Sequence, residues 1–200
     1  PAVFKTDAID PETAAFNTQL RDVLAAAPSI DTLEPAVIRA QRAEGQGPMG
    51  PLVFSDMAVD RHIAGPGGQL RLRTFVPETV NGVYLHIHGG GWVLGSADAQ
   101  DPLLEQLARR SSVAVVSVDY RLAPEHPYPA GPDDCEAAAL WLLQRAQAEF
   151  GSARLLIGGE SAGAHLSVVT LLRLRDKHQF GGVLGANLTF GVYDLAQTPS

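Results

Sequence analysis

The hydrophobic and polar positions of this 200-residue chain change their period near residue 52. Before that point, apolar residues recur every three or four positions, as they do along one face of an amphipathic helix. They predict a first helix that begins at Asp10-Pro11 and ends at Pro28, and a second over residues 34–44. The segment 45–48 resembles a flexible linker. Residues 1–47 are therefore expected to form an N-terminal helical cap segment, or a packed extension, and residues 48–200 a second domain.

Beyond residue 52, short apolar runs alternate with helical patterns. The runs predict strands over residues 53–63, 70–76, 83–87, 113–118, 154–158 and 183–190. Helical spacing predicts helices over residues 102–110, 132–150 and 162–177, the first with Leu103, Leu104 and Leu107 on one face. Asn81-Gly82 is a strong signal for a two-residue hairpin turn. Hairpins followed by alternating strands and helices indicate an α/β fold, with a mostly parallel sheet and helices on both faces.

Composition narrows the classes of protein. Hydrophobic residues make up 46% of the chain and charged residues 18%, as in an ordinary globular domain. The net charge of -7 argues against nucleic acid or an anionic membrane surface as the main partner. No apolar run is long enough for an integral membrane segment, and residues 1–5 lack a signal-peptide core, so a cytoplasmic location is expected. The single Cys135 cannot form an internal disulfide.

The candidate chemistry begins with Gly159-Glu160-Ser161-Ala162-Gly163, between a predicted strand and a predicted helix. A serine at the tip of such a tight turn has a strained backbone and a projecting hydroxyl, so Ser161 is the candidate nucleophile. Side chains at positions 159 and 163 would collide in this turn, which explains the two glycines. Ala162 opens the helix, where backbone N–H groups stabilise negative charge. Taken alone, the pattern also fits an ordinary turn between a core strand and a helix.

A second motif, His88-Gly89-Gly90-Gly91-Trp92, follows the strand predicted at 83–87. Successive backbone N–H groups in a glycine-rich loop can point at one place, as an oxyanion hole requires. The candidate donors are therefore the N–H groups of Gly89, Gly90 and Ala162, and Trp92 is a candidate for lining the substrate pocket. A phosphate-binding loop is the alternative, but the chain has no Gly-x-x-x-x-Gly-Lys motif, and no cofactor is expected.

Two histidines of this region raise the question of a metal. His86 and His88 alternate along one strand and could bind a metal ion together. The sequence shows no third ligand, so we predict no metal site and structural roles for both histidines.

The two motifs, together with the stretch Asp119 to Ala130 (DYRLAPEHPYPA), resemble the hormone-sensitive-lipase-like branch of the α/β-hydrolases. This branch contains bacterial carboxylesterases related to arylacetamide deacetylase. The resemblance covers about residues 50–195 and implies an α/β-hydrolase fold. It also implies that five further residues belong to the motifs of the family: His88, Gly91, Gly159, Glu160 and Gly163. In this family the residue at the position of Glu160 is not the acid of the catalytic triad.

In α/β-hydrolases the catalytic acid and histidine follow the serine along the chain. The chain has four acidic or histidine residues after Ser161, and none of them fits these roles: His165, His178, Asp176 and Asp194. The resemblance places both the acid and the base beyond Ser200, so the triad acid and base are not expected in this chain and the C-terminal part of the fold is expected to be missing. We expect these 200 residues alone to be inactive and their last strand to present an exposed apolar edge.

These observations predict a carboxylesterase that hydrolyses short- to medium-chain esters through a serine nucleophile and an acyl-enzyme. Its partner is a small-molecule ester, and a homo-oligomer or pairing with the C-terminal remainder of the fold stays open. The main alternative is a non-catalytic small-molecule receptor or binding protein, because plant gibberellin receptors resemble this family and lack the catalytic histidine. A lipase of long acyl chains is a nearer alternative. A structural subunit would leave both motifs unexplained.

Overall fold

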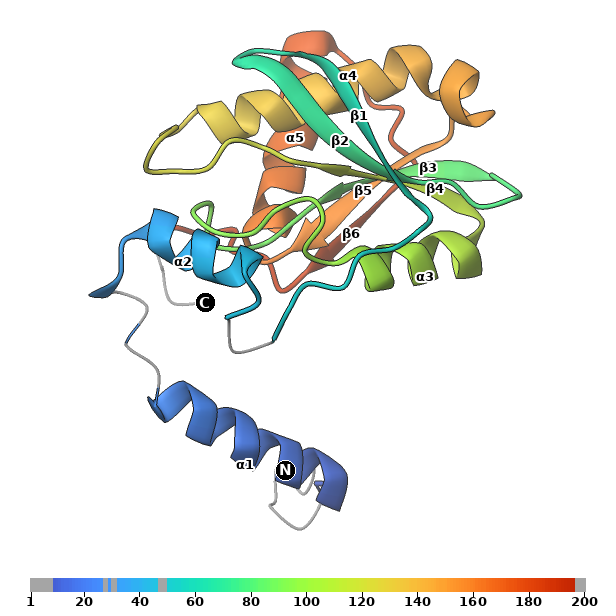
Figure 1. Ribbon diagram of the computed structural model, residues 1–200. Coiled ribbons are helices and arrows are strands. Elements are labelled where there is room, and N and C mark those ends of the chain that lie inside the picture. Colours follow the sequence, from blue (N-terminus) through green and yellow to red (C-terminus); the bar gives the residue numbers. More distant parts are fainter. Residues whose placement is uncertain (1–8, 27–28, 30–31, 47–49, 197–200) are drawn as a thin grey trace. The chain divides into compact units, whose positions relative to one another are not determined.

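The computed structural model describes residues 9–26, 29, 32–46 and 50–196 (Figure 1). The chain divides into two compact units, residues 1–51 and 52–200. The predicted boundary follows residue 47, and residues 47 and 48 of the predicted linker lie outside the described residues. The roles of these units as a cap segment and a catalytic domain stay predictions.

The first unit contains two helices, α1 (Pro11–Ala26) and α2 (Pro35–Ala43), where two helices were predicted. The Asp10 carboxylate accepts a 2.9 Å hydrogen bond from the backbone N–H of Glu12, which is the geometry of an N-cap. Each helix begins with a proline, at a position where the missing N–H costs no helical hydrogen bond. The predicted end of the first helix at Pro28 lies outside the described residues.

The second unit is built on a six-stranded sheet with the strand order β1-β2-β4-β3-β5-β6. β1 pairs with β2, and β2 with β4, in antiparallel register, and the other three pairs are parallel. The mostly parallel sheet that the sequence predicted is therefore confirmed. The strands have these bounds: β1 (Ala58–Gly65), β2 (Gly68–Phe75), β3 (Gly82–Ile87), β4 (Val113–Val118), β5 (Leu155–Glu160) and β6 (Gly185–Thr189).

The predicted hairpin at Asn81-Gly82 is wrong. β4 lies between β2 and β3, so the strands on either side of this dipeptide are not neighbours. The Asn81 N–H instead donates a 2.8 Å hydrogen bond to the carbonyl of Ser112, and Gly82 pairs with Val113 in parallel register. The apolar strand β4 is buried between β2 and β3, and this burial outweighs the local preference of the Asn-Gly dipeptide for a tight turn.

The first strand of the sheet begins later than predicted, at Ala58 rather than at residue 53. Side chains hold the segment before it in an irregular conformation. The Ser55 N–H donates to the Asp101 carboxylate at 2.9 Å, and the Met57 N–H donates to the Ser55 hydroxyl at 3.0 Å. These bonds satisfy backbone groups that a strand would have offered to a neighbour.

Helices cover both faces of the sheet, as predicted (Figure 1). α4 (Ala130–Phe150) and α5 (Ala162–His178) pack on one face, and α3 (Asp101–Ser111) packs on the other. The strands alternate between these layers: Leu85 and Ile87 of β3 join the α4–α5 core, whereas Tyr84 packs with Leu104 of α3. None of the described helices is both long enough and apolar enough to cross a lipid bilayer.

Leu103 and Leu104 do not share the buried face of α3, contrary to the prediction. Leu104 is 1% exposed, whereas Leu103 is 54% exposed. Neighbouring positions of a helix point about 100° apart, so only one of the two can face the sheet fully.

The path of the chain places the carboxyl ends of β3 and β5 side by side. From β3 the chain passes through α3 to β4 on one side of β3, and from β4 it returns through α4 to β5 on the other side. The loop after β3 leads to one face of the sheet and the turn after β5 leads to the other. Ligands of open α/β sheets bind at such a switch point, beyond the carboxyl ends of the strands. Both sequence motifs begin there.

Candidate active site

Ser161 is the single residue between the end of β5 and the start of α5. Its backbone has φ 52 and ψ −116, a strained conformation for a residue with a side chain. Two hydrogen bonds hold the turn: the Ser161 N–H donates to the Thr189 carbonyl at 2.9 Å, and the Ser161 carbonyl accepts from the His165 N–H at 3.1 Å. The neighbouring strand and the first turn of the helix together maintain the strain.

Gly159 and Gly163 are required by the close approach of β3. A Cβ atom at either position would overlap the carbonyl oxygen of Ile87, the last residue of β3. The predicted collision across the turn is present as well, because a Cβ at Gly159 would lie 3.0 Å from the carbonyl carbon of Gly163. The tighter restriction, however, comes from a strand more than seventy residues earlier in the chain.

The glycine loop lies against the serine turn. A Cβ atom at Gly89 would lie 3.6 Å from the Cβ of Ser161 and 2.8 Å from the carbonyl oxygen of Glu160. Gly90 and Gly91 have φ values of 122 and 62, which glycine adopts without strain. Within the described residues, no acceptor is recorded for the backbone N–H groups of Gly89, Gly90 and Ala162. The loop that carries Gly89 and Gly90 and the turn that carries Ser161 thus meet at the switch point.

His88 anchors the start of this loop. Its Nδ1 lies 2.8 Å from the Gly89 carbonyl oxygen, and its ring stacks on Tyr120 with a centroid separation of 4.2 Å. The Tyr120 hydroxyl in turn donates to the His88 carbonyl at 2.9 Å. Burial lowers the pKa of His88 to about 4, so the ring is neutral at physiological pH, and its Nδ1–H donates the hydrogen bond to the Gly89 carbonyl. The geometry is that of a structural anchor for the loop.

Glu160 belongs to a network that the sequence analysis did not identify. His86 Nε2 lies 3.1 Å from the Glu160 carboxylate, and His86 Nδ1 lies 2.9 Å from the Ser117 hydroxyl. Burial by itself would raise the pKa of Glu160, but the hydrogen bond and the charge of His86 bring it below its usual value. Ser117 is fully buried in β4, so this Ser-His-Glu arrangement cannot reach a substrate. The signal that could have indicated this network is the alternation of side chains along β3, β4 and β5, which places His86, Ser117 and Glu160 on the same face of the sheet.

Among the described residues, His86 of β3 and His88, which directly follows this strand, are not brought together with a third possible metal ligand. Among the residues that the structure describes, no three His, Cys, Asp or Glu side chains are placed to hold a metal ion. His86 is bound to Glu160 and Ser117, and His88 to its own loop.

The acidic and histidine side chains after Ser161 are engaged elsewhere. His165 Nδ1 lies 2.7 Å from the Val192 carbonyl, and His178 Nε2 lies 2.7 Å from Glu136. Asp176 pairs with the neighbouring Arg175, and the Asp194 carboxylate accepts from the Ala196 N–H at 2.9 Å. In the described part of the chain, no hydrogen-bond partner is recorded for the Ser161 hydroxyl.

A pocket of about 380 Å³ lies beside the serine turn, between the start of α5 and the segment 120–132. Trp92 lines it, as does His165, whose ring meets the Trp92 ring edge-on at a centroid distance of 5.3 Å. Ser161 itself is one helical turn away and is not part of the lining. Other lining residues are largely aromatic or apolar, with two polar side chains: Tyr120, Tyr128, Leu166, Val169, Arg121 and His126.

Known proteins resemble this chain in sequence and in fold. The profile of a family described as alpha/beta hydrolase fold matches residues 84–200. Carboxylic ester hydrolase LipN of Mycobacterium tuberculosis is 41% identical over 137 residues, which are 66% of this chain and 36% of LipN. Esterase LipI of the same organism is 38% identical over 177 residues, 82% of this chain and 53% of LipI. A solved esterase of Pyrobaculum calidifontis has a TM-score of 0.76 at 29% identity, covering 90% of this chain and 60% of that one. The chain thus spans about a third to three fifths of these proteins.

Proposed function

Because this chain belongs to the hormone-sensitive-lipase-like branch of the α/β-hydrolase family, we propose that the protein containing it hydrolyses carboxylic esters with Ser161 as the nucleophile. The names of LipN and LipI as ester hydrolases support the reaction class. The observation that carries the assignment to Ser161 is the contact between the serine turn and the glycine loop, where Gly89 has no room for a side chain.

In the proposed reaction, the Ser161 Oγ attacks the ester carbonyl carbon and its proton passes to a general base. The carbonyl electron pair moves to oxygen, and the backbone N–H groups of Gly89, Gly90 and Ala162 stabilise the oxyanion. One such donor typically contributes about 2.7–4 kcal/mol to the transition state. Collapse of the tetrahedral intermediate expels the alcohol, which takes the proton. Water then attacks the acyl-enzyme by the same route and releases the carboxylic acid.

The general base and the carboxylate that orients it are proposed to come from a part of the protein outside this chain. α/β-Hydrolases place both after the nucleophile in the chain. The histidines after Ser161 in the described residues are bound to Val192 and Glu136 instead. The relatives extend well beyond the matched region, which leaves length for both groups.

The proposed substrates are esters with short or medium acyl chains. The pocket beside the serine turn has a volume of about 380 Å³ and largely aromatic and apolar walls, including Trp92. A site of this size and lining suits a small apolar group. Trp92 contacts His165, so the orientation of the indole ring is set by α5.

Ser161→Ala in the full-length protein tests the nucleophile. Removal of the hydroxyl should lower kcat for p-nitrophenyl acetate and butyrate by roughly 10⁴- to 10⁶-fold. It should also abolish the mass increase that a fluorophosphonate probe produces on the wild-type protein. Ser152→Ala is the matched control and should leave both readouts unchanged, because the Ser152 hydroxyl accepts the Arg154 N–H at 3.3 Å, away from the serine turn.

Either of two results would contradict the proposal. Retained turnover by Ser161→Ala would exclude Ser161 as the nucleophile. Absence of turnover by the wild-type protein across a series of esters would favour the alternative of a binding protein.

A further inference from the structure

The three glycines of the loop, Gly89, Gly90 and Gly91, have no side chains that could hold their own N–H groups in place, so neighbouring groups must do so. The segment that follows, residues 94–98, packs directly against it and is called the backing segment below. The Leu94 N–H donates to the Gly90 carbonyl at 2.9 Å, and a Cβ at Gly90 would overlap the Leu94 carbonyl. A Cβ at Gly95 would lie 2.6 Å from the Gly89 carbonyl oxygen. A shift of the backing segment would therefore shift Gly89 and Gly90.

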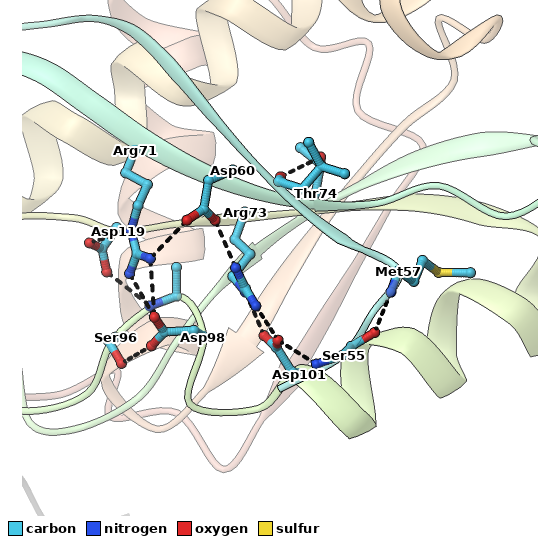
Figure 2. Close-up of polar contacts among 12 residues, drawn as sticks. Ser55, Met57, Asp60, Arg71, Arg73, Thr74, Ser96, Asp98, Asp101 and Asp119 are labelled. Carbon is cyan, nitrogen blue, oxygen red and sulfur yellow. Dashed lines mark hydrogen bonds and ion pairs between the residues drawn. The ribbon is translucent and has the colours of Figure 1, made fainter. Parts of the chain in front are cut away.

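Arg71 of β2 holds the backing segment through two carboxylates (Figure 2). Asp119 bridges the two: one carboxylate oxygen accepts the Ala97 N–H at 2.9 Å, and the other accepts Arg71 Nε at 3.1 Å. Asp98 is bound directly, because both terminal nitrogens of Arg71 lie 3.0 Å from one of its oxygens. The Ser96 hydroxyl donates to the remaining Asp98 oxygen at 2.5 Å.

The charges of this group favour a fixed geometry. The Arg71 side chain is 25% exposed and also reaches Asp60 at 3.3 Å, so three carboxylates surround one guanidinium. Burial by itself would lower the pKa of Arg71, but Asp119 and Asp98 raise it above its ordinary value. The planar guanidinium forms several directed bonds at once, which a lysine ammonium does with less geometric specificity.

Arg73, two residues along the same strand, lies close to these carboxylates but binds a different set of partners. Its guanidinium binds Asp101 at the start of α3 and Asp60 of β1. None of these recorded contacts touches residues 94–98 (Figure 2). Arg71 binds a side chain of the backing segment directly, whereas Arg73 is linked to the segment through Asp101, whose N–H donates to the Asp98 carbonyl at 3.4 Å.

We propose that Arg71 is a positioning residue for the oxyanion hole, acting through Asp119 and Asp98 on the backing segment. The inference rests on the proposed function, since it assigns a catalytic role to the N–H groups of Gly89 and Gly90. Loss of the guanidinium would let these donors move away from the oxyanion. Substrate binding in the ground state would be largely retained, because Arg71 does not line the pocket.

The test is the kinetics of Arg71→Gln and Arg71→Lys in the full-length enzyme, normalised to active sites titrated with fluorophosphonate. Arg71→Gln should lower kcat roughly 10- to 100-fold, below the 10²- to 10³-fold typical of losing one oxyanion donor outright, with KM changed less than about threefold. Arg71→Lys should recover part of kcat. Arg61→Gln is the matched control, because it removes an ion pair with Glu149 at 2.9 Å and should leave kcat unchanged.

A second readout separates positioning from general stability. The affinity for a trifluoromethyl ketone, which forms a tetrahedral oxyanion on the serine, should fall in Arg71→Gln by the same factor as kcat/KM. The affinity for the corresponding uncharged amide should stay within about threefold. A lower melting temperature with unchanged kinetics per titrated site would overturn the inference.

Asp98→Asn provides the test if Arg71→Gln does not fold. It removes the negative charge from one of the two links between Arg71 and the backing segment, and it should lower kcat in the same direction by a smaller factor. An unchanged kcat in Asp98→Asn would overturn the inference. Failure of the proposed function is recognised separately, by turnover in Ser161→Ala.

Discussion

At the scale of single residues, the site depends on positions where a side chain is impossible. The missing side chains of Gly159 and Gly163 leave room for the Ile87 carbonyl, and the missing side chain of Gly89 leaves room for the serine turn. Ser161 itself occupies a conformation with φ 52 that the surrounding backbone must impose. The local pattern correctly indicates a tight turn, but the atom that requires glycine belongs to another strand.

Gly159→Ala should lower the free energy of unfolding by more than about 3 kcal/mol, because the added Cβ collides with backbone that cannot move without breaking the pairing of β3 and β5. Urea unfolding of the full-length protein measures this. Gly181→Ala is the control, since a Cβ there meets no atom within 4 Å, and its effect should stay within about 0.5 kcal/mol. Equal urea midpoints for Gly159→Ala and the wild-type protein would show that the turn can relax.

At the scale of elements, alternation along each strand decides which layer a residue joins. β3 sends Leu85 and Ile87 to the α4–α5 core and Tyr84 to α3. His86 lies opposite Ser117 of the parallel strand β4, which allows their 2.9 Å contact. The hydrophobic period along the sequence was enough to predict which segments form strands and which form helices. It did not predict which strands pair with each other.

The two leucines at the start of α3 should differ sharply in their effect on stability. Leu104→Ala is expected to lower the free energy of unfolding by about 2–5 kcal/mol, because it leaves a cavity beneath a side chain that is 1% exposed. Leu103→Ala, at a position 54% exposed, should change it by less than about 1 kcal/mol. Thermal or urea unfolding compares the two variants, and equal losses would contradict the observed orientation of the helix.

At the scale of the molecule, the reversal of strand order at β3 brings the glycine loop and the serine turn together. The same sheet has β6 at one edge, paired with β5 alone among the described strands. Large apolar side chains on and around β6 are exposed, and they include Leu184, Leu188, Phe190 and Tyr193. An open strand edge beside apolar side chains favours association with other chains.

The 200-residue chain produced by itself should therefore self-associate, and light scattering should give a mass well above 21.2 kDa. Replacing Leu184 and Phe190 by lysine should reduce the association, because both side chains are at least 60% exposed next to β6. Leu103→Lys, on the far helix α3, should not. A clean monomer of the unaltered chain would contradict this expectation.

The sequence by itself determined the fold class, the strand and helix types, the nucleophile candidate and the glycine loop. These are properties of neighbouring residues: a hydrophobic period, an N-cap at Asp10, or Gly-x-Ser-x-Gly between a strand and a helix. Only the tertiary structure decided that β4 separates β2 from β3, that Ile87 crowds Gly159, and that Arg71 reaches Asp119. The last pair lies 48 positions apart, and such contacts follow from burial and hydrogen bonding across the whole sheet, which no short stretch of sequence encodes.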